Sequence, residues 1–217
     1  MKVPFAPMAI EPVKLHTADG LALEGELRVP GEVRAAVVLA HPHPVHGGNM
    51  RSIVIGALFD GLPAAGVAAL RFNFRGVGTS EGVFDDGRGE RLDVVAAIDV
   101  LHEIVEGLPL VLAGWSFGAD TSLAVNDERH SGWFAVAPPL RRPDEVPAAV
   151  DPRPTLLAVP EHDQFRSPES AYDVTASWTN TRIEVVAGAD HFLVGRTDRV
   201  VELAIAFVGE VRDESAR

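Results

Sequence analysis

The chain has 217 residues, of which 47% are hydrophobic and 23% are charged, a composition typical of a globular domain and too apolar for a disordered chain. Its formal net charge of −12 makes the surface repel phosphate backbones and anionic lipid headgroups, so we expect neither nucleic-acid binding nor membrane binding. Because the sequence contains no cysteine, it excludes disulfides, thiolate metal sites and a cysteine nucleophile.

The length and the N-terminal sequence predict one domain, residues 1–217, in the cytoplasm. A chain of this length buries enough surface for a sizeable core without disulfides or a structural metal. Residues 1–12 contain no apolar run of the kind found in a secretory signal. No stretch reaches the roughly 18 consecutive apolar residues that a membrane-spanning helix needs.

The first predicted element is an antiparallel hairpin. Residues 13–16 and 21–29 are β-rich, and the turn signal Ala18-Asp19-Gly20 joins them. The next run, residues 35–40, is continuously apolar, which predicts a strand that is covered on both faces.

The remaining chain alternates between helical and extended patterns. A helix is expected over 50–65, with Asn49 as its N-cap and Gly66 at its end. Further strands are predicted at 67–72, 110–113, 133–137, 155–159 and 183–186, with helices at 88–105, 119–125, 169–178 and 198–211. This alternation indicates right-handed crossovers and an α/β fold, with a doubly wound, mostly parallel sheet and the hairpin at one edge. The irregular stretch 138–154 is too short for a separate domain, so any lid must come from it or from other short loops.

The sharpest local motif is a candidate nucleophile elbow. Residues 110–118 read LVLAGWSFG, in which Gly114-Trp115-Ser116-Phe117-Gly118 fits the pattern G-x-S-x-G. The motif lies between a predicted strand and a predicted helix, and its glycines allow the chain to double back sharply with the serine hydroxyl exposed. The alternative interpretation is an ordinary glycine-rich turn in which the serine only caps a helix.

A serine hydroxyl needs a base within hydrogen-bond reach and an acid that orients the base. In a doubly wound sheet such groups lie just after the strands, at their carboxyl ends. Asp163 follows the strand predicted at 155–159, and His191 follows the strand predicted at 183–186. They complete the chain order Ser, Asp, His that this architecture uses, and Asp190 is the second choice for the acid.

The other seven histidines have simpler interpretations. His162 neighbours Asp163 in the sequence and is a weaker candidate for the base, whereas packed or solvated positions explain His16, His102 and His130. The cluster at His41, His43 and His46 suggests a metal, but the two intervening prolines disfavour a regular helix or a central strand, and no second ligand cluster is evident. We therefore expect no metal.

A glycine-rich segment at 71–82, read as RFNFRGVGTSEG, raises the alternative of a dinucleotide-binding oxidoreductase. The dinucleotide fingerprint needs a third glycine at the position of Glu81, where an acidic side chain would face the pyrophosphate. We expect instead a tight turn in which Arg75 bonds loop carbonyls or a carboxylate, and no cofactor.

Taken together, the motifs H-P-H-P-x-x-G-G at 41–48, R-F-N-F-R-G-V-G-x-S-x-G at 71–82, G-W-S-F-G at 114–118 and A-D-H-F at 189–192 resemble those of the α/β-hydrolase superfamily. The likeness covers nearly the whole chain and is greatest to the compact, lidless, esterase-like branch. It implies a mostly parallel sheet of eight strands without a large cap, with Ser116 as nucleophile, His191 as base and Asp163 as acid. Pro160 departs from the G-x-x-D pattern frequent in such proteins, which predicts a stiffer loop around Asp163.

In this fold the oxyanion hole takes one N–H from the residue after the nucleophile and one from the loop after an early strand. The first is Phe117. The second is assigned to His43, because Pro42 and Pro44 have no N–H to donate. The predicted function is hydrolysis of a carboxylic ester through an acyl-enzyme, with a small-molecule acyl substrate as the partner.

Two alternatives to carboxylester hydrolysis remain at this level. Thioesterases and amidases or peptidases use the same triad, and the sequence does not separate them from esterases. The second alternative is a catalytically silent hydrolase-fold protein that serves as a binding module, against which the presence of Ser116, Asp163 and His191 argues. The sequence carries no signal of oligomeric state.

Overall fold

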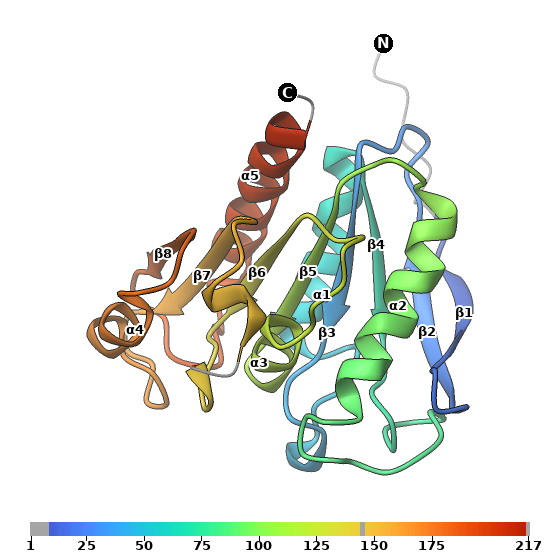
Figure 1. Ribbon diagram of the computed structural model, residues 1–217, viewed down its shortest axis with the longest axis horizontal. Helices are drawn as coiled ribbons and strands as arrows, with labels where there is room; N and C mark the ends of the chain where they lie inside the picture. Colours follow the sequence, from blue (N-terminus) through green and yellow to red (C-terminus); the bar gives the residue numbers. More distant parts are fainter. Residues whose placement is uncertain (1–8, 144–145, 216–217) are drawn as a thin grey trace.

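The computed structural model describes residues 9–143 and 146–215. These residues form one sheet of eight strands in the order β1-β2-β4-β3-β5-β6-β7-β8 (Figure 1). The strands are β1 (Glu11–His16), β2 (Ala22–Arg28), β3 (Ala35–Ala40), β4 (Val67–Phe72), β5 (Leu110–Trp115), β6 (Gly132–Val136), β7 (Thr155–Pro160) and β8 (Thr181–Val186). All neighbours from β4 to β8 in this order are parallel, whereas β1 pairs antiparallel with β2, and β2 with β4. The predicted α/β fold, with a mostly parallel sheet and a hairpin at one edge, is confirmed.

The helices cover both faces of the sheet. They are α1 (Ile53–Gly61), α2 (Glu90–Ile104), α3 (Phe117–Leu123), α4 (Pro168–Thr175) and α5 (Thr197–Ser215), with short 3-10 turns η1 (Pro44–His46), η2 (Leu62–Ala65) and η4 (Pro147–Ala149). Helices α1 and α5 pack on one face, and α2, α3 and α4 pack on the other (Figure 1). No helix in the described ranges is both long enough and apolar enough to cross a membrane.

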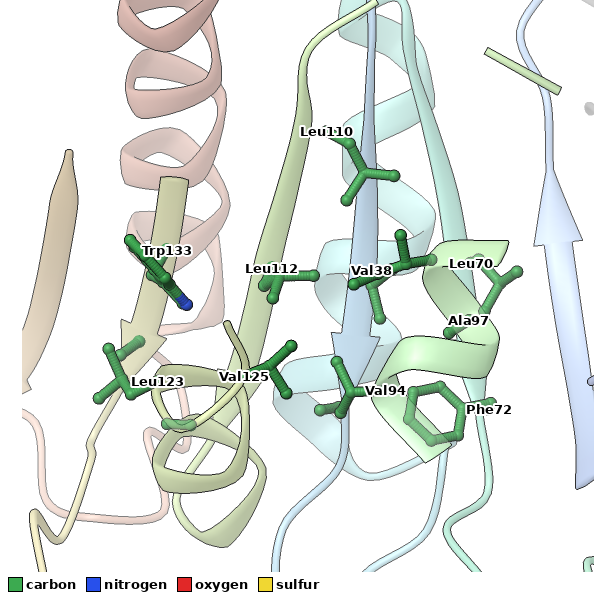
Figure 2. Close-up of a cluster of buried hydrophobic side chains, with 14 of the residues drawn as sticks. Val38, Leu70, Phe72, Val94, Ala97, Leu110, Leu112, Leu123, Val125 and Trp133 are labelled. Atoms are coloured by element: carbon green, nitrogen blue, oxygen red, sulfur yellow. The ribbon is translucent and has the colours of Figure 1, made fainter. Parts of the chain in front are cut away.

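Each face of the sheet carries its own buried apolar cluster. Figure 2 shows part of the cluster on the α2 face, where Val38, Leu70 and Leu112 of neighbouring strands pack with Val94 and Ala97 of α2. The strands β3, β4 and β5 are buried along their whole length, because helices cover both of their sides. These central strands form the rigid base from which the loops of the site extend.

The first helix departs from its prediction. It begins at Ile53 rather than at residue 50, and Ser52 occupies the N-cap position instead of Asn49. The Asn49 side chain instead accepts a hydrogen bond from the Arg51 N–H at 2.9 Å, and this local turn competes with the start of a helix. Gly66 closes the helical stretch as expected, in the left-handed conformation with φ of 79° after η2.

Arg75 has the structural role expected for it. Its guanidinium donates hydrogen bonds to the carboxylate of Asp93 on α2 at 2.7 and 2.9 Å, and to Asp19 in the turn of the hairpin at 2.9 and 3.2 Å. The ion pairs join the glycine-rich loop after β4 to both the edge hairpin and α2. Glu81, from the same loop, accepts a hydrogen bond from the Ala22 N–H at 2.8 Å and so also holds the hairpin.

Candidate active site

Ser116 lies at a sharp turn between β5 and α3, with φ of 55° and ψ of −117°. This backbone conformation is strained for a residue with a side chain, and such strain persists where the surrounding structure enforces it. The flanking glycines are part of that enforcement. A Cβ on Gly114 would lie 2.3 Å from the Gly118 main chain, and a Cβ on Gly118 would lie 2.2 Å from the Ala40 carbonyl oxygen. Only glycine fits at either position, so the turn can hold the serine between them.

The structure brings Ser116, His191 and Asp163 together from three separate loops. His191 Nδ1 lies 2.8 Å from Asp163 Oδ2, and His191 Nε2 lies 2.9 Å from Ser116 Oγ. A carboxylate only accepts, so Nδ1 carries the proton, and in the neutral ring Nε2 is left as the acceptor for the serine hydroxyl. This tautomer is the one that a general base for Ser116 requires.

Asp163 is held firmly in its loop after β7. Its second oxygen, Oδ1, accepts hydrogen bonds from the Phe165 and Arg166 N–H groups at 2.7 and 3.2 Å. The Asp163 N–H in turn donates to the carbonyl of Pro160, the last residue of β7, at 3.3 Å. With both oxygens engaged and the side chain only 1% exposed, the carboxylate has a single orientation toward the histidine.

The two weaker candidates from the sequence lie elsewhere. Asp190, the second choice for the acid, is exposed and accepts from the Phe192 N–H at 3.0 Å. His162 has a side chain that is 68% exposed, with its Nε2 3.8 Å from Glu161. Neither residue is hydrogen-bonded to the ring of His191 in the described structure.

The loop after β3 is organised around His41, a buried residue that the sequence did not single out for this role. Its Nδ1 lies 2.6 Å from the Pro42 carbonyl oxygen, so Nδ1–H is the donor, and its Nε2 accepts from the Phe74 N–H at 3.0 Å. Burial lowers the pKa of His41 from 6.5 to about 4, which keeps this ring neutral. Because the C=O and N–H of a trans peptide point in opposite directions, the bond to Pro42 turns the His43 N–H away from the His41 ring.

The two main-chain groups predicted to bind an oxyanion have no acceptor of their own. Within the described residues, neither the His43 N–H nor the Phe117 N–H donates a hydrogen bond to the protein. Gly48 allows the loop to close over this point, because a Cβ there would lie 2.1 Å from the Pro42 carbonyl oxygen. The two free donors are thus available to a bound group.

Two histidines of this loop lie close to each other. The rings of His43 and His46 lie 4.6 Å apart between centroids, and no third ligand joins them in the described part of the chain. Burial, followed by the charges of His46 and Arg141, lowers the pKa of His43. Its Nδ1 accepts from the Val45 N–H at 3.3 Å at the start of η1.

A cleft of about 520 Å³ opens beside Ser116 and His191. Trp115 forms part of its wall and donates its indole N–H to the His191 carbonyl at 3.1 Å. The tryptophan is thus both packed beside the turn and a border of the cleft. Phe165, whose ring lies 4.4 Å from that of His191, and Phe192 border the opening.

A second, smaller cavity of about 80 Å³ lies beside the cleft, and Arg141 borders both. Asp120 of α3 lines the small cavity, and its carboxylate accepts from the Leu140 and Arg141 N–H groups at 2.9 and 3.2 Å. Burial raises the pKa of the Asp120 carboxyl. The sequence did not predict this arrangement. The only related signal was the richness in arginine and proline of residues 138–154.

Comparison with known proteins places the fold in a superfamily. No family model matches the chain. An uncharacterized protein of Rickettsia prowazekii is 30% identical over 189 residues, which are 81% of this chain and 79% of that protein. Among solved structures, an α/β serine hydrolase homologue from Coxiella burnetii superposes with a TM-score of 0.81 and 29% identity, over 90% of this chain and 96% of that one.

A serine hydrolase of Xanthomonas campestris that has no lid gives a TM-score of 0.81 with 25% identity, over 95% of this chain and 96% of the other. The fold and these likenesses define an α/β hydrolase. The chain belongs to the α/β-hydrolase superfamily. The predicted class of fold is confirmed, and the described residues contain no large cap.

Proposed function

We propose that the protein is a serine hydrolase that cleaves carboxylic esters through an acyl-enzyme. The observation that carries the proposal is the His191 ring, which bridges Asp163 at 2.8 Å and Ser116 at 2.9 Å. The serine borders an open cleft of about 520 Å³, a size that suits a small-molecule substrate. The two N–H groups without an acceptor, those of His43 and Phe117, complete the set of groups that acyl transfer needs.

In the proposed acylation step, Ser116 Oγ forms a bond to the acyl carbon while its proton passes to His191 Nε2. Asp163 keeps the Nδ1 proton in place and stabilises the imidazolium that forms. The carbonyl electron pair moves onto its oxygen, where the N–H groups of His43 and Phe117 donate to the negative charge. When the carbonyl reforms, the ester bond breaks and the alcohol leaves with the proton from Nε2.

Deacylation repeats these steps with water. His191 takes a proton from the attacking water, the oxyanion forms again between the two N–H donors, and Ser116 Oγ leaves with the proton returned by the histidine. The carboxylic acid is released and the starting state is restored. Each proton taken up by Nε2 is thus given back within the same half-reaction, and the chain's own side chains carry all of these transfers.

The proposal is tested by the hydrolysis of 4-nitrophenyl acetate, butyrate and octanoate by the wild type and by Ser116→Ala. Removal of the nucleophile should lower kcat/KM by about a thousandfold or more. Thr121, on the same helix, donates its hydroxyl to the Phe117 carbonyl, and Thr121→Ser serves as a matched control that should keep most of the activity. Equal activity of the wild type and Ser116→Ala would contradict the assignment of the nucleophile.

A wild-type protein that cleaves none of these three esters would contradict carboxylester hydrolysis. The matching thioester and anilide would then be compared in the same way. If either substrate is hydrolysed and the hydrolysis requires Ser116, the proposed triad stands, and the bond that the enzyme cleaves is a thioester or an amide rather than an ester. No turnover, together with failure of a fluorophosphonate to label Ser116, would favour a silent binding module.

A further inference from the structure

The charge of the cleft differs from the charge of the whole protein. The chain carries a formal net charge of −12, yet among the described residues that line the cleft none is an aspartate or a glutamate. Arg141 is the one lining residue with a permanent charge. A substrate entering this cleft therefore meets a cation and no lining carboxylate, in a protein whose surface otherwise repels anions.

The guanidinium of Arg141 makes no hydrogen bond and no ion pair with a described residue, although its charge acts on the nearby Asp120 carboxylate and His43 ring. The two neighbouring arginines differ in this respect. Arg142 lies 3.5 Å from the carboxylate of Asp86, which also lines the small cavity. Arg166 donates to the carbonyls of Pro139 and Leu140 at 2.9 to 3.2 Å. An arginine that offers five N–H donors next to a nucleophile, with none of them used by the protein, is available to a ligand.

The main chain under Arg141 is fixed, although its side chain is free. Asp120 accepts from the N–H groups of both Leu140 and Arg141, and Leu140 has φ of 51°, a conformation that needs such support. Arg166 holds the same turn from the side of the Asp163 loop. Asp120 lies on α3, four residues after Ser116, so the base of the arginine is anchored to the helix that carries the nucleophile.

The remaining wall of the cleft is largely apolar. Ile53, Phe165 and Phe192 border it, with 47%, 57% and 51% of their surface exposed. Exposed apolar side chains that are gathered around a cleft mark a binding surface for apolar groups. A ligand that fits both features has an apolar part and one anionic group.

From these observations we infer that Arg141 selects ester substrates that carry a carboxylate in addition to the ester bond. The inference rests on the proposed hydrolase function and names its substrate class. One guanidinium fork matches one carboxylate through two parallel N–H to oxygen bonds. A single cation compensates a single negative charge, which favours a carboxylate over a phosphate dianion.

The test uses two pairs of esters, each with a charged and a neutral member. In the first pair, mono-4-nitrophenyl glutarate carries a carboxylate on its acyl group and 4-nitrophenyl valerate does not. In the second pair, 4-acetoxybenzoate carries a carboxylate on its leaving group and phenyl acetate does not. The measured quantity is the ratio of kcat/KM for the charged ester to that for its neutral counterpart. Wild type, Arg141→Gln and the control Arg142→Gln are compared, because Arg142 lines the small cavity and not the catalytic cleft.

In at least one pair, Arg141→Gln should lower this ratio by about tenfold, mainly through a higher KM, since it removes a charge-assisted contact at a solvated site. The ratio of Arg142→Gln should stay close to that of the wild type. In the wild type, added salt should lower the ratio, and in Arg141→Gln it should have little effect. A ratio that Arg141→Gln leaves unchanged, or that Arg142→Gln lowers equally, overturns the inference while the hydrolase proposal stands.

If the wild type hydrolyses none of the four esters, the hydrolase proposal fails separately, and binding decides the inference. Monomethyl glutarate, which carries one ester and one carboxylate, is then titrated by calorimetry into wild type and Arg141→Gln. Binding to the wild type that the variant loses supports the carboxylate subsite. Absence of binding to the wild type, or equal binding to both proteins, overturns it.

Discussion

Two buried acid–base pairs in this molecule look alike but differ in what surrounds them. Asp93 and Asp163 each place a buried carboxylate within 2.9 Å of a nitrogen, from Arg75 in one case and His191 in the other. All three guanidinium nitrogens of Arg75 are bonded to Asp93 or Asp19. In contrast, the far nitrogen of His191 meets only a serine hydroxyl at the border of an open cleft.

The difference between the two pairs lies in how many of their hydrogen-bonding groups are already engaged within the protein, and it separates the structural pair from the pair proposed to be reactive. When every nitrogen of a group is already hydrogen-bonded within the protein, as at Arg75, the group holds elements together and has little capacity left for a ligand. When the hydrogen-bond chain ends at a hydroxyl beside a cleft, a proton can pass along it to a bound molecule. The two pairs should therefore respond to the same type of substitution in opposite ways.

The largest effect is expected for Asp163→Asn. An amide oxygen can still accept from Phe165 and Arg166, but the amide nitrogen would donate to His191 Nδ1 and force the ring into the wrong tautomer. Activity toward 4-nitrophenyl butyrate should fall by roughly ten-thousandfold, while the urea midpoint of unfolding changes little. If Asp163→Asn strongly lowered the free energy of unfolding but left the folded protein active, Asp163 would have a structural role and no role in catalysis.

Asp93→Asn should show the reverse behaviour. It leaves Arg75 buried with an incomplete partner, and breaking such a pair costs about 3–5 kcal/mol of unfolding free energy. Specific activity of the folded fraction should stay close to that of the wild type. Urea unfolding followed by circular dichroism measures the first quantity and an esterase assay measures the second. If Asp93→Asn left the urea midpoint unchanged but abolished the activity, the distinction between the structural pair at Asp93 and the pair at Asp163 would be contradicted.

His41 is intermediate between the structural pair at Arg75 and the pair at His191. Both of its ring nitrogens are hydrogen-bonded within the protein, but one of these bonds orients the His43 peptide in the candidate active site. Its pKa is lowered to about 4, so between about pH 6.5 and 4 the unfolded chain binds a proton that the folded chain does not. Stability is therefore full above pH 6.5 and is lost as the pH falls toward 4.

When the pH is lowered from 7 to 5, the uptake of a proton by His41 in the unfolded chain should reduce the free energy of unfolding by about 2 kcal/mol. His130, whose pKa burial lowers to about 3, acts in the same direction. His41→Asn should reduce the loss between pH 7 and pH 5 by that amount, as measured by urea unfolding at both values. His162→Asn, at an exposed position, is the control that should keep the wild-type loss. An equal loss in His41→Asn and the wild type would show that His41 is not the titrating group.

The strands could be predicted from sequence because burial on both faces leaves a continuous apolar run. Residues 35–40 and 67–72 match β3 and β4 at both ends. Helix starts were less accurate, because they depend on local hydrogen bonds. Helix α1 begins at Ile53, three residues after its predicted start, because the Asn49 side chain forms a local turn. Helix α3 begins at Phe117, two residues before its predicted start, directly after the sharp turn at Ser116.

Within the site, the sequence indicated those residues whose position is tied to a strand end. Ser116, Asp163 and His191 each follow a parallel strand, and the sheet brings such positions to one edge. It could not indicate Arg141, whose place depends on a bond from Asp120 across to the turn after β6. The role of His41 was missed for the same reason, since its partner at Phe74 lies on another loop.

The central claim is that His191 and Asp163 activate Ser116. It is tested most directly by the rate of labelling with a fluorophosphonate, with the adduct located by peptide mass spectrometry in wild type, Ser116→Ala and His191→Ala. One adduct is expected, on Ser116; it should be absent from Ser116→Ala and should form at least a hundredfold more slowly in His191→Ala. An adduct on another residue, or a rate that His191→Ala leaves unchanged, would contradict the central claim.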